Sequence, residues 1–477
     1  MFKLKRYTCI GLLGICLAGA GCKVPAIVQS TESKPVPGFY EAGMDSVAMT
    51  GIQWRTFFTD QNLVNLIDTA LTNNQELLIT LQEIEMAKND IRIRQAPLLP
   101  TVGARAGLGV EKVGRYTSQG AGDASTDIKP GKGVPDVLTN FGGAFYANWE
   151  VDIWNKLHTA KQAAVTRYLA TLEGKNFVLT NLVAEVANSY YELLALDTQL
   201  DIVRQNINLQ KNALDIVKVQ KEAARVTELA VQKFQAEVLK SQSLEFAILQ
   251  NIKETENRIN LLLARYPQPV VRNKSAFLSL IPQVISTGLP SQLLVNRPDI
   301  RQAELNLAAA KLDVKVARAE FYPSLGISAA LGLQAFKPSY LVKLPESILF
   351  SLAGDIAGPL INRMAIKAEF ANANARQLQA LYNYERSILN AYLDVVTQLS
   401  KIDNLGKSYD LKLKQVDALN LSTNIANDLF RSARADYFEV LMTQRDALEA
   451  RLELVETKKD QLNTVVNIFR NLGGGWQ

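Results

Sequence analysis

A helical pattern that runs through a proline into an alternating pattern occurs twice in this chain, and it restricts the possible folds more than any other feature. In the second copy, residues 296–320 are rich in Ala, Leu and Lys, which favour helix. Pro298 suits the first helical position, and Pro323 ends the helix. Residues 324–332 then alternate large apolar side chains with Ser and Gly, which is typical of a strand.

The first copy of this unit lies at residues 73–109 and aligns with residues 296–332 without a gap. The matched positions include Pro100 with Pro323, Gly103 with Gly326, and Asp90 with Asp313. Two similar helix ends could arise by chance. Matched prolines and glycines instead favour an internal duplication of the chain.

Cysteine and histidine usage argues against most metal and redox chemistry. The three cysteines are Cys9, Cys16 and Cys22, so no disulfide or thiolate metal site is expected beyond the N-terminus. His158 is the only histidine, which disfavours histidine-centred catalysis and multi-histidine metal sites. The net charge of +5 is well mixed along the chain and does not indicate nucleic-acid binding.

The N-terminus has the pattern of a lipoprotein export signal, predicted over residues 1–21. A basic segment precedes an apolar run that is too short to span a bilayer. Small residues then lead to Cys22, which is expected to become the lipidated first residue of the mature chain. An ordinary secretory signal with an incidental cysteine is the alternative. Residues 22–55, rich in Pro, Ser, Thr and Gly, predict an extended tether.

Alternating hydrophobicity predicts two strands in each half of the chain. The predicted strands lie at about residues 99–110, 141–151, 323–333 and 347–356. Residues 111–140 lack periodicity and predict a long exposed loop. A second loop is predicted at residues 334–346.

The rest of each half is predicted to be a very long helical hairpin. In the first half, helix runs from Asn155 to about Glu222, turns at residues 223–227 and returns to about Arg265. At 1.5 Å per residue the first arm is on the order of 100 Å long, and its regularly spaced Leu and Val residues indicate a coiled-coil seam. The second half repeats this plan, with its turn near residues 433–436. The predicted organisation is a first repeat at 56–265, a linker at 266–295, a second repeat at 296–472 and a C-terminal tail at 473–477.

Four strands per chain cannot close a membrane barrel, and open strand edges cannot remain in lipid. Known single-chain membrane barrels begin at about eight strands, so these strands are predicted to be shared between chains. One strand face is apolar, as lipid requires, and the other is small or polar, as a wet lumen requires. The candidate lumen residues are Arg105, Tyr146, Asn148 and Glu150. A soluble β-sandwich is the alternative, but it would not explain the export signal and the coiled coils together.

Short motifs also follow one another in a characteristic order. They are Trp54, Phe57, Phe58 and Asp60; Leu63, Leu66, Ile67, Ala70 and Leu71 before Asn73 and Asn74; Pro100; Trp149, Glu150, Val151 and Asp152; Asn296, Arg297, Pro298, Asp299 and Ile300; and Asp436, Tyr437, Phe438, Glu439, Val440 and Leu441. With the duplication, this order resembles the TolC-like outer membrane factors of bacterial tripartite efflux pumps, lipoprotein branch. The resemblance covers essentially the whole mature chain.

The resemblance implies an α+β membrane protein that forms a homotrimer. Three chains would then build a twelve-stranded β-barrel continuous with a long α-helical coiled-coil tunnel through the periplasm. It also implies a lipid-anchored location in the outer membrane, with a periplasmic adapter and an inner-membrane RND-type pump as partners. Substrate would be conducted passively, so no catalytic residue, no metal and no cofactor beyond the covalent lipid on Cys22 is expected.

Apertures in the family are closed by rings of charged residues at the second helical turn. Two acidic family positions lie three apart; the first matches Glu439, whereas the second is Met442 here. Arg434 and Asp436 are close enough in sequence to contribute, so Arg434, Asp436 and Glu439 are the candidate aperture residues. A three-fold axis would triple each charge in a narrow mouth. Simple solvation of an exposed turn is the alternative role.

Other functions remain open from the sequence. Metal-ion efflux and type I secretion use the same kind of duct, so the substrate is undecided. A periplasmic adapter lipoprotein would carry one helical hairpin and a compact β-rich domain, rather than two hairpins and barrel-like strands. A lipid-anchored periplasmic enzyme is disfavoured by the single histidine and the lack of a free cysteine.

Acylation of Cys22 is the first testable expectation. Mass spectrometry of the mature N-terminus should find a lipid-modified cysteine, because Cys22 alone follows a short apolar run and small residues. The variant Cys22→Ala should lack the modification. An unmodified chain that begins at another residue would contradict the prediction.

Overall fold

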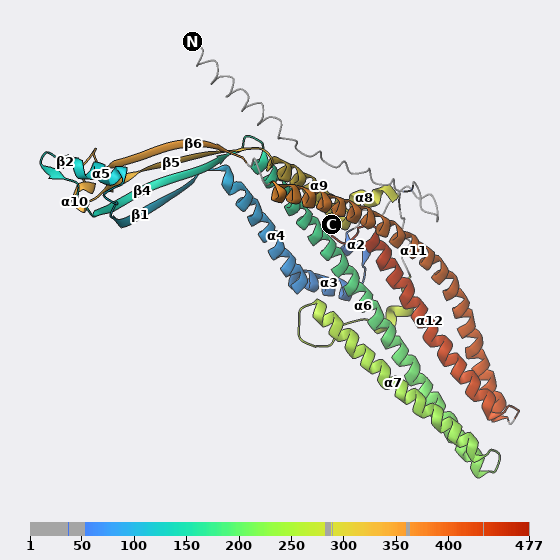
Figure 1. The fold of residues 1–477 in the computed structure, drawn as a ribbon. Coiled ribbons are helices and arrows are strands. Elements are labelled where there is room, and N and C mark those ends of the chain that lie inside the picture. The colour runs from blue at the N-terminus through green and yellow to red at the C-terminus, as the bar shows by residue number, and fades with distance from the viewer. Residues whose placement is uncertain are drawn as a thin grey trace. The chain divides into compact units, whose positions relative to one another are not determined.

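The computed structural model describes residue 37 and residues 53–281, 288, 290–358, 363–432 and 434–476 (Figure 1). Cys22 and the predicted export signal lie outside these residues. The chain divides into two compact units. Among the described residues, unit 1 covers Met86–Tyr168 and Leu305–Leu381. Unit 2 covers the described parts of Glu32–Glu85, Leu169–Glu304 and Tyr382–Gln477. Each unit therefore combines corresponding segments of the two halves.

Long helices dominate the described residues. They are α3 (Gln61–Asn73), α4 (Gln75–Gln95), α6 (Lys156–Glu222), α7 (Glu228–Leu262), α9 (Pro298–Ala319), α11 (Met364–Arg431) and α12 (Tyr437–Asn471). The shorter helices are α2 (Trp54–Phe57), α5 (Ser118–Ser125), α8 (Leu293–Asn296) and α10 (Pro338–Leu341), with 3-10 turns η1 (Ala96–Leu98), η2 (Lys274–Ser279) and η3 (Pro290–Gln292). Within the described ranges, no helix has both the length and the apolar character that crossing a bilayer demands.

The four long strands form one antiparallel sheet in unit 1, in the order β1-β4-β5-β6. They are β1 (Thr101–Glu111), β4 (Leu138–Val151), β5 (Ser324–Ala335) and β6 (Ile348–Ala357). The strands of each half do pair, β1 with β4 and β5 with β6. In addition, β4 pairs with β5 from Phe141 opposite Ala335 to Val151 opposite Leu325. The strand pairs of the two halves are therefore joined in a single sheet.

The two predicted loops at 111–140 and 334–346 are not structureless, which corrects the sequence analysis. The first contains α5 and a small ribbon of β2 (Asp127–Lys129) and β3 (Lys132–Gly133), and the second contains α10. Local side chains stabilise these elements. The Thr117 hydroxyl accepts a hydrogen bond from Gly120 N (3.1 Å) and caps α5, and Asp127 accepts one from Gly131 N (2.9 Å). Such bonds leave no periodic signal in the sequence.

The main core lies in unit 2, where the N-terminal aromatic segment packs against the last helix. The rings of Phe57 and Phe469 are stacked with centroids 4.1 Å apart. Trp54, which falls within the predicted tether, is buried in α2. The hydroxyl of the buried Tyr190 donates to Asp60 Oδ2 (2.6 Å), while Asp60 Oδ1 accepts from Asn62 N and caps α3. Burial and the Asp60 carboxylate together raise the pKa of Tyr190.

The glycines of the predicted C-terminal tail are buried rather than free. Gly473 has a φ of +87°, and a Cβ at this position would lie 2.4 Å from the carbonyl oxygen of Asn296. Glycine permits both this conformation and the close backbone approach. The tail therefore packs against the chain just before α9.

A buried ion-pair network fixes the start of the predicted linker in unit 2. Arg272, with 8% of its side chain exposed, pairs with Asp197 of α6 and with Glu256 of α7 (2.6 Å). Its Nη2 and Nε atoms donate to both oxygens of Asp197. Lys274 Nζ lies 3.1 Å from the same carboxylate. One guanidinium thus connects two antiparallel helices to the segment that follows them.

Replacement of Arg272 should destabilise unit 2. Arg272→Ala leaves Asp197, whose side chain is 1% exposed, without its bidentate partner, and should lower the free energy of unfolding by about 3–5 kcal/mol. Chemical denaturation should measure this loss, and limited proteolysis should show earlier cleavage near residues 266–281. Arg272→Lys is the control, since it keeps the charge but cannot form the planar fork. A wild-type denaturation curve for Arg272→Ala would show that the network is dispensable.

Candidate functional site

The register of the sheet places the four candidate lumen residues on one face. Asn148 lies opposite Thr101, Tyr146 opposite Gly103, and Arg105 opposite Ala144. Glu150 follows Asn148 by two residues and shares its face. Gly103 leaves room for the Tyr146 ring, because a Cβ there would lie 2.5 Å from the ring. On the same face Asp355 of β6 lies opposite Gly326 of β5.

The opposite face of the sheet is apolar and exposed. Leu108 and Leu352 are each 79% exposed, and Phe350 is 77% exposed. Further exposed apolar side chains on this face are Val102, Val110, Phe145, Leu331 and Ile356. An uncovered apolar surface of this extent is unusual for a chain in water and marks a surface that another apolar phase covers.

Glu150 is not a free carboxylate. Lys156 Nζ lies 2.7 Å from Glu150 Oε1 and 3.5 Å from Glu320 Oε1, and so joins the end of β4 to the end of α9. Burial alone would lower the pKa of Lys156, but the two carboxylates outweigh it and raise the pKa above its ordinary value. Lys156 therefore stays charged and continues the polar face from the sheet to the helices.

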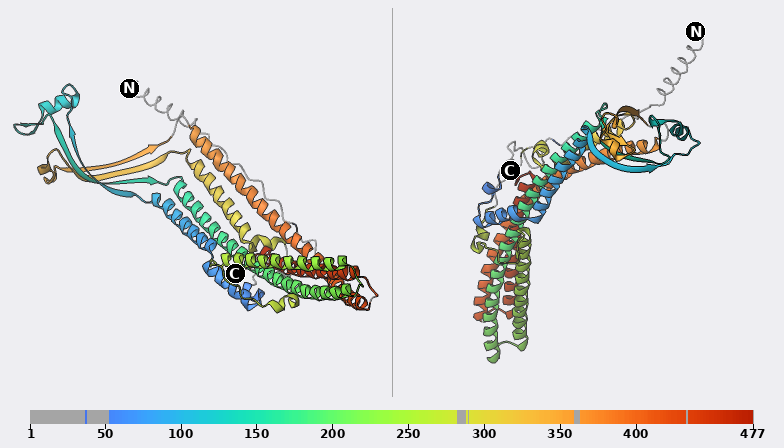
Figure 2. Two further views of the ribbon diagram at one scale, coloured as in Figure 1. Left: turned by 90° about the horizontal axis from the view of Figure 1, so that it is seen from below. Right: turned by 90° about the vertical axis from the view of Figure 1, so that its left-hand side faces the viewer.

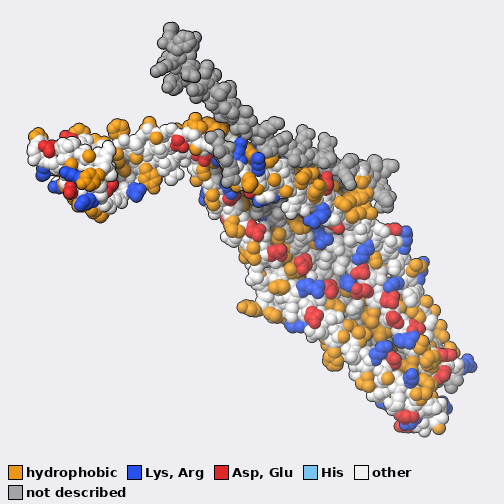
Figure 3. Space-filling model, viewed as in Figure 1, with side chains coloured by type: hydrophobic (Ala, Val, Ile, Leu, Met, Phe, Trp, Pro, Cys, Tyr) orange, Lys and Arg blue, Asp and Glu red, His pale blue; other side chains and the backbone are white. Residues whose placement is uncertain are grey.

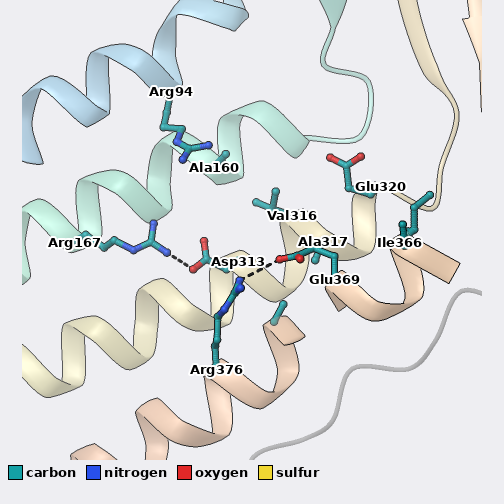
Figure 4. Close-up of a pocket in the computed structure, with 12 residues that line it drawn as sticks. Arg94, Ala160, Arg167, Asp313, Val316, Ala317, Glu320, Ile366, Glu369 and Arg376 are labelled. Carbon is teal, nitrogen blue, oxygen red and sulfur yellow. Dashed lines mark hydrogen bonds and ion pairs between the residues drawn. The ribbon is translucent and has the colours of Figure 1, made fainter. Parts of the chain in front are cut away.

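A charged hollow of about 580 Å³ lies beyond this pair, between α4, α6, α9 and α11 of unit 1 (Figure 4). Arg94, Arg167 and Arg376 come from three of these helices, and Asp313 lies among them on α9. Arg167 forms an ion pair with Asp313, whereas Arg376 Nη1 lies 3.1 Å from Glu369. Burial raises the pKa of Asp313 despite the three guanidinium groups.

The sequence analysis did not identify this hollow, although one signal pointed to it. Asp313 matches Asp90 in the internal duplication, and each aspartate pairs with an arginine. Arg94 Nε lies 3.7 Å from Asp90, one helical turn away. The pairing of Asp90 with Arg94 could be predicted because the two residues lie one helical turn apart. The contact of Arg167 with Asp313 could not, because these residues are far apart in the sequence. The lining carries three arginines against Asp313, Glu320 and Glu369, so its charges balance.

Asp152 forms the link between β4 and α6. Its two carboxylate oxygens accept hydrogen bonds from Leu157 N (3.0 Å) and His158 N (2.8 Å) at the start of the helix. The ring of His158 also contacts Asp152 at 2.7 Å through Nδ1. Burial raises the pKa of Asp152, but the bonds from His158 and Leu157 outweigh burial and hold the pKa below its ordinary value. The only histidine of the chain therefore takes part in a helix cap.

Both helical hairpins end in short turns (Figures 1 and 2). At the first, Lys221 and Glu228 form an ion pair across the turn between α6 and α7. At the second, Arg434, Asp436 and Glu439 are all exposed, and Glu439 N donates to Asp436 O (3.1 Å). Within the described residues, no ion pair connects these three side chains to one another or to other groups of the chain.

An apolar cluster lies beneath both turns and packs the two hairpins together in unit 2. It comprises Ala213, Leu214, Val217, Ala230, Val231, Phe234, Val238, Ala426, Phe430, Val440 and Leu441. This apolar packing therefore holds in place the second turn, which carries the exposed charges. Their carboxylates are available to a neighbouring molecule. Among the residues that the structure describes, no group of three His, Cys, Asp or Glu side chains is arranged to hold a metal ion.

Comparison with known proteins gives a consistent result. A family model described as outer membrane efflux protein matches residues 66–265 and 289–474. The pyoverdine export outer membrane protein OpmQ of Pseudomonas aeruginosa is 30% identical over 470 residues, which cover 98% of this chain and 97% of that protein. The cation efflux system protein CusC of Escherichia coli is 27% identical over 477 residues, covering 98% and 99% of the two chains.

The fold is also similar to that of solved channels. The open state of the Neisseria gonorrhoeae MtrE outer membrane channel superimposes with a TM-score of 0.81 at 21% identity. The match covers 95% of this chain and 98% of the MtrE chain. At this identity the likeness concerns the fold alone.

Two aspartates of unit 1 should change stability with pH in opposite directions. The folded pKa of Asp152 is lowered, so its contribution is present above its ordinary pKa of about 3.8 and is lost as the pH falls through the folded pKa. Asp152→Asn should therefore cost about 1 kcal/mol at pH 7 and less in acid. The folded pKa of Asp313 is raised, so ionisation opposes folding as the pH rises.

Thermal unfolding of Asp152→Asn, Asp313→Asn and the unmutated protein between about pH 3 and pH 7 measures both effects. Relative to the unmutated protein, the thermal stability of Asp152→Asn should fall as the pH rises, and the thermal stability of Asp313→Asn should increase. Parallel pH profiles for the two variants would contradict the assigned shifts.

Proposed function

The chain belongs to the outer membrane efflux protein family, and from this premise we propose how its fold forms a passive export channel. It is an outer membrane component of an efflux system. The work of export is done by a partner pump, and the chain supplies a conduit rather than an active site. We assign the lipid anchor to Cys22, on the basis of the export signal.

The open sheet is the observation that carries the proposal. β1 and β6 each have a single neighbour in the sheet, so their outer edges retain free backbone donors and acceptors. An edge of this kind cannot remain in hydrocarbon unless another strand pairs with it. Pairing of β1 with β6 of the next chain satisfies both edges, and three chains give a closed barrel of twelve strands.

The two faces of the sheet fit this assembly. The exposed apolar face, with Leu108 and Leu352, would contact lipid, and the face with Arg105, Tyr146 and Asn148 would line a wet lumen. The long helices also carry exposed apolar side chains that contacts between chains would cover. Examples are Val219, Leu239, Phe246, Leu411 and Leu421. The helices would then form the tunnel that continues the barrel.

The pump selects the substrate in this proposal. OpmQ is named for pyoverdine export and CusC for cation efflux, so one duct architecture serves chemically different cargo. The balanced charges of the hollow around Asp313 give it no preference for one sign of charge. We propose a periplasmic adapter and an inner-membrane RND-type pump as partners. Metal-ion efflux and type I secretion remain second candidates that differ only in the partner.

Disulfide cross-linking tests the shared barrel. Gly107→Cys on β1 is combined in turn with Leu349→Cys, Ser351→Cys and Ala353→Cys on β6, all of which lie on one face. Gly107 has open space around its Cα, so the side chain is accommodated. At least one combination should yield a covalent ladder that ends at the trimer. Each single variant is a control and cannot pass the dimer; a ladder in none of the combinations, or one that exceeds the trimer, would contradict the barrel.

Two pairs of substitutions at the second turn test the aperture. In planar bilayers, Asp436→Ala with Glu439→Ala should raise single-channel conductance and weaken cation preference. Removal of fixed negative charge lowers the local cation concentration, and shorter side chains widen the mouth. Trimer stability should change little, because both side chains are exposed and an exposed ion pair to a neighbouring chain would contribute only about 0–1 kcal/mol.

The isosteric pair Asp436→Asn with Glu439→Gln separates charge from size. It should weaken cation preference to the same degree without the gain in conductance, because the side chains keep their size. If conductance and selectivity of both pairs equal those of the unmutated channel, the constriction lies elsewhere.

A further inference from the structure

The loops at the far end of the sheet carry four lysines that the channel function does not use. Lys129 and Lys132 flank the turn of the β2–β3 ribbon, and Lys337 and Lys343 flank α10. We call these four residues the distal lysine cluster. All four are exposed, and within the described residues none of them forms an ion pair with a carboxylate. Figure 3 shows blue Lys and Arg side chains beside orange hydrophobic ones at this end of the sheet.

One aromatic ring brings the two loops together. Lys129 Nζ lies 5.6 Å from the centre of the Tyr340 ring, and Lys343 Nζ lies 5.3 Å from it. The Phe336 ring packs edge-to-face against Tyr340 with centroids 5.2 Å apart. Cation–π contacts position the ammonium groups but leave their donors free. Because both ammonium groups lie close to one ring, an anion beside that ring would be attracted by both of them.

The surroundings of the cluster are both basic and apolar. Residues 127–133 and 337–346 contain the four lysines and two carboxylates, Asp127 and Glu346, so these two segments carry a net charge of +2. Asp127 already accepts the backbone N–H of Gly131. Beside Lys343, Val342 is 80% exposed and Leu344 is 62% exposed. A ligand that matches this surface has anionic groups next to hydrocarbon.

The strands fix the depth of the cluster relative to the membrane. β1 begins next to the end of α4 and spans 11 residues, or roughly 37 Å at about 3.4 Å per residue. At the tilt of about 35–45° that membrane barrels have, this length corresponds to roughly 26–31 Å along the membrane normal. It matches the hydrocarbon core of about 30 Å, so the loops at its far end lie at the outer headgroup level. This step rests on the proposed function, which places the sheet across the outer membrane.

We propose that the distal lysine cluster binds the phosphate groups of a phosphorylated glycolipid of the outer leaflet, with its acyl chains against Val342, Leu344 and the apolar face of the sheet. Lysine ammonium groups at an interface attract anionic lipid, and their aliphatic stems remain in contact with hydrocarbon. Tyr340 acts as the platform that holds the lysines of the two loops together. The lipid would thus connect the β2–β3 ribbon to α10.

Native mass spectrometry of the full-length protein in detergent, with added diphosphoryl lipid A as the probe, tests the proposal. The variant Lys129→Ala/Lys337→Ala/Lys343→Ala should lose affinity by roughly fivefold per lysine, on the order of a hundredfold in total. Monophosphoryl lipid A should bind the unmutated protein more weakly, and inorganic phosphate should not displace the lipid. Tyr340→Phe should retain binding, whereas Tyr340→Ala should weaken it.

Lys233→Ala/Lys253→Ala/Lys414→Ala is the matched control, since these three lysines are exposed on the long helices and form no ion pair in the described residues. Its lipid binding should equal that of the unmutated protein. Equal binding by the triple variant, or equal losses in triple variant and control, would overturn the proposal. A change in channel selectivity with lipid binding intact would place the cluster in the lumen instead. Lipid binding is measured without conduction, so an unmutated protein that binds lipid A but forms no channel would refute the proposed function alone.

Discussion

The pairing of β4 with β5 is the contact on which unit 1 depends. Each half of the chain supplies a two-stranded hairpin, and an isolated hairpin of this kind has marginal stability. The β4–β5 ladder joins the two strand pairs over most of the length of both strands, from Phe141 to Val151 on β4. It also brings the helices that flank these strands, α6 and α9, to one end of the sheet, where Lys156 pairs with Glu320. The charged hollow around Asp313 follows from this arrangement.

Polar and charged side chains in unit 1 form contacts at the junctions between strands and helices. Asp152 caps α6 where β4 ends, and Trp154 Nε1 donates to Pro323 O (2.7 Å) where β5 begins. These contacts are polar, short-range and directional, unlike the apolar packing that joins the hairpins beneath their turns in unit 2. In the proposed channel, these junction contacts would hold the strands in a fixed position relative to the helices within each chain.

The surfaces left open are as informative as the packed core. Among the residues that the structure describes, one sheet face exposes leucine and phenylalanine, the outer edges of two strands have no neighbouring strand, and the long helices present apolar side chains to the outside. Each of these features is unfavourable in free energy for a single chain in water or in lipid. Contact with lipid and with further copies of the chain would remove this unfavourable contribution. The four lysines of the distal lysine cluster are a smaller example of the same kind, since within the described residues none of them forms an ion pair with a carboxylate.

The sequence by itself determined the periodic elements. Prolines such as Pro323 ended helices, alternation marked strands, and the spacing of Leu and Val marked the helical hairpins, because each depends on neighbours within a few residues. The two-residue period also predicted that Tyr146, Asn148 and Glu150 share one face of a strand, and the register between β1 and β4 adds Arg105 to that face.

Only the tertiary structure decided which distant residues meet. The pairing of Glu150 with Lys156 and Glu320, the contact of Arg167 with Asp313, and the network of Arg272 depend on how strands and helices from both halves pack. The sequence also did not predict the burial of the C-terminal glycines or the small helices and strands within the predicted loops. They rest on single hydrogen bonds, such as that from Gly131 to Asp127, and on backbone contacts that carry no periodicity. Local secondary structure follows from the spacing of residues in the sequence. The pairing of distant charges depends on the tertiary structure, which this spacing does not specify.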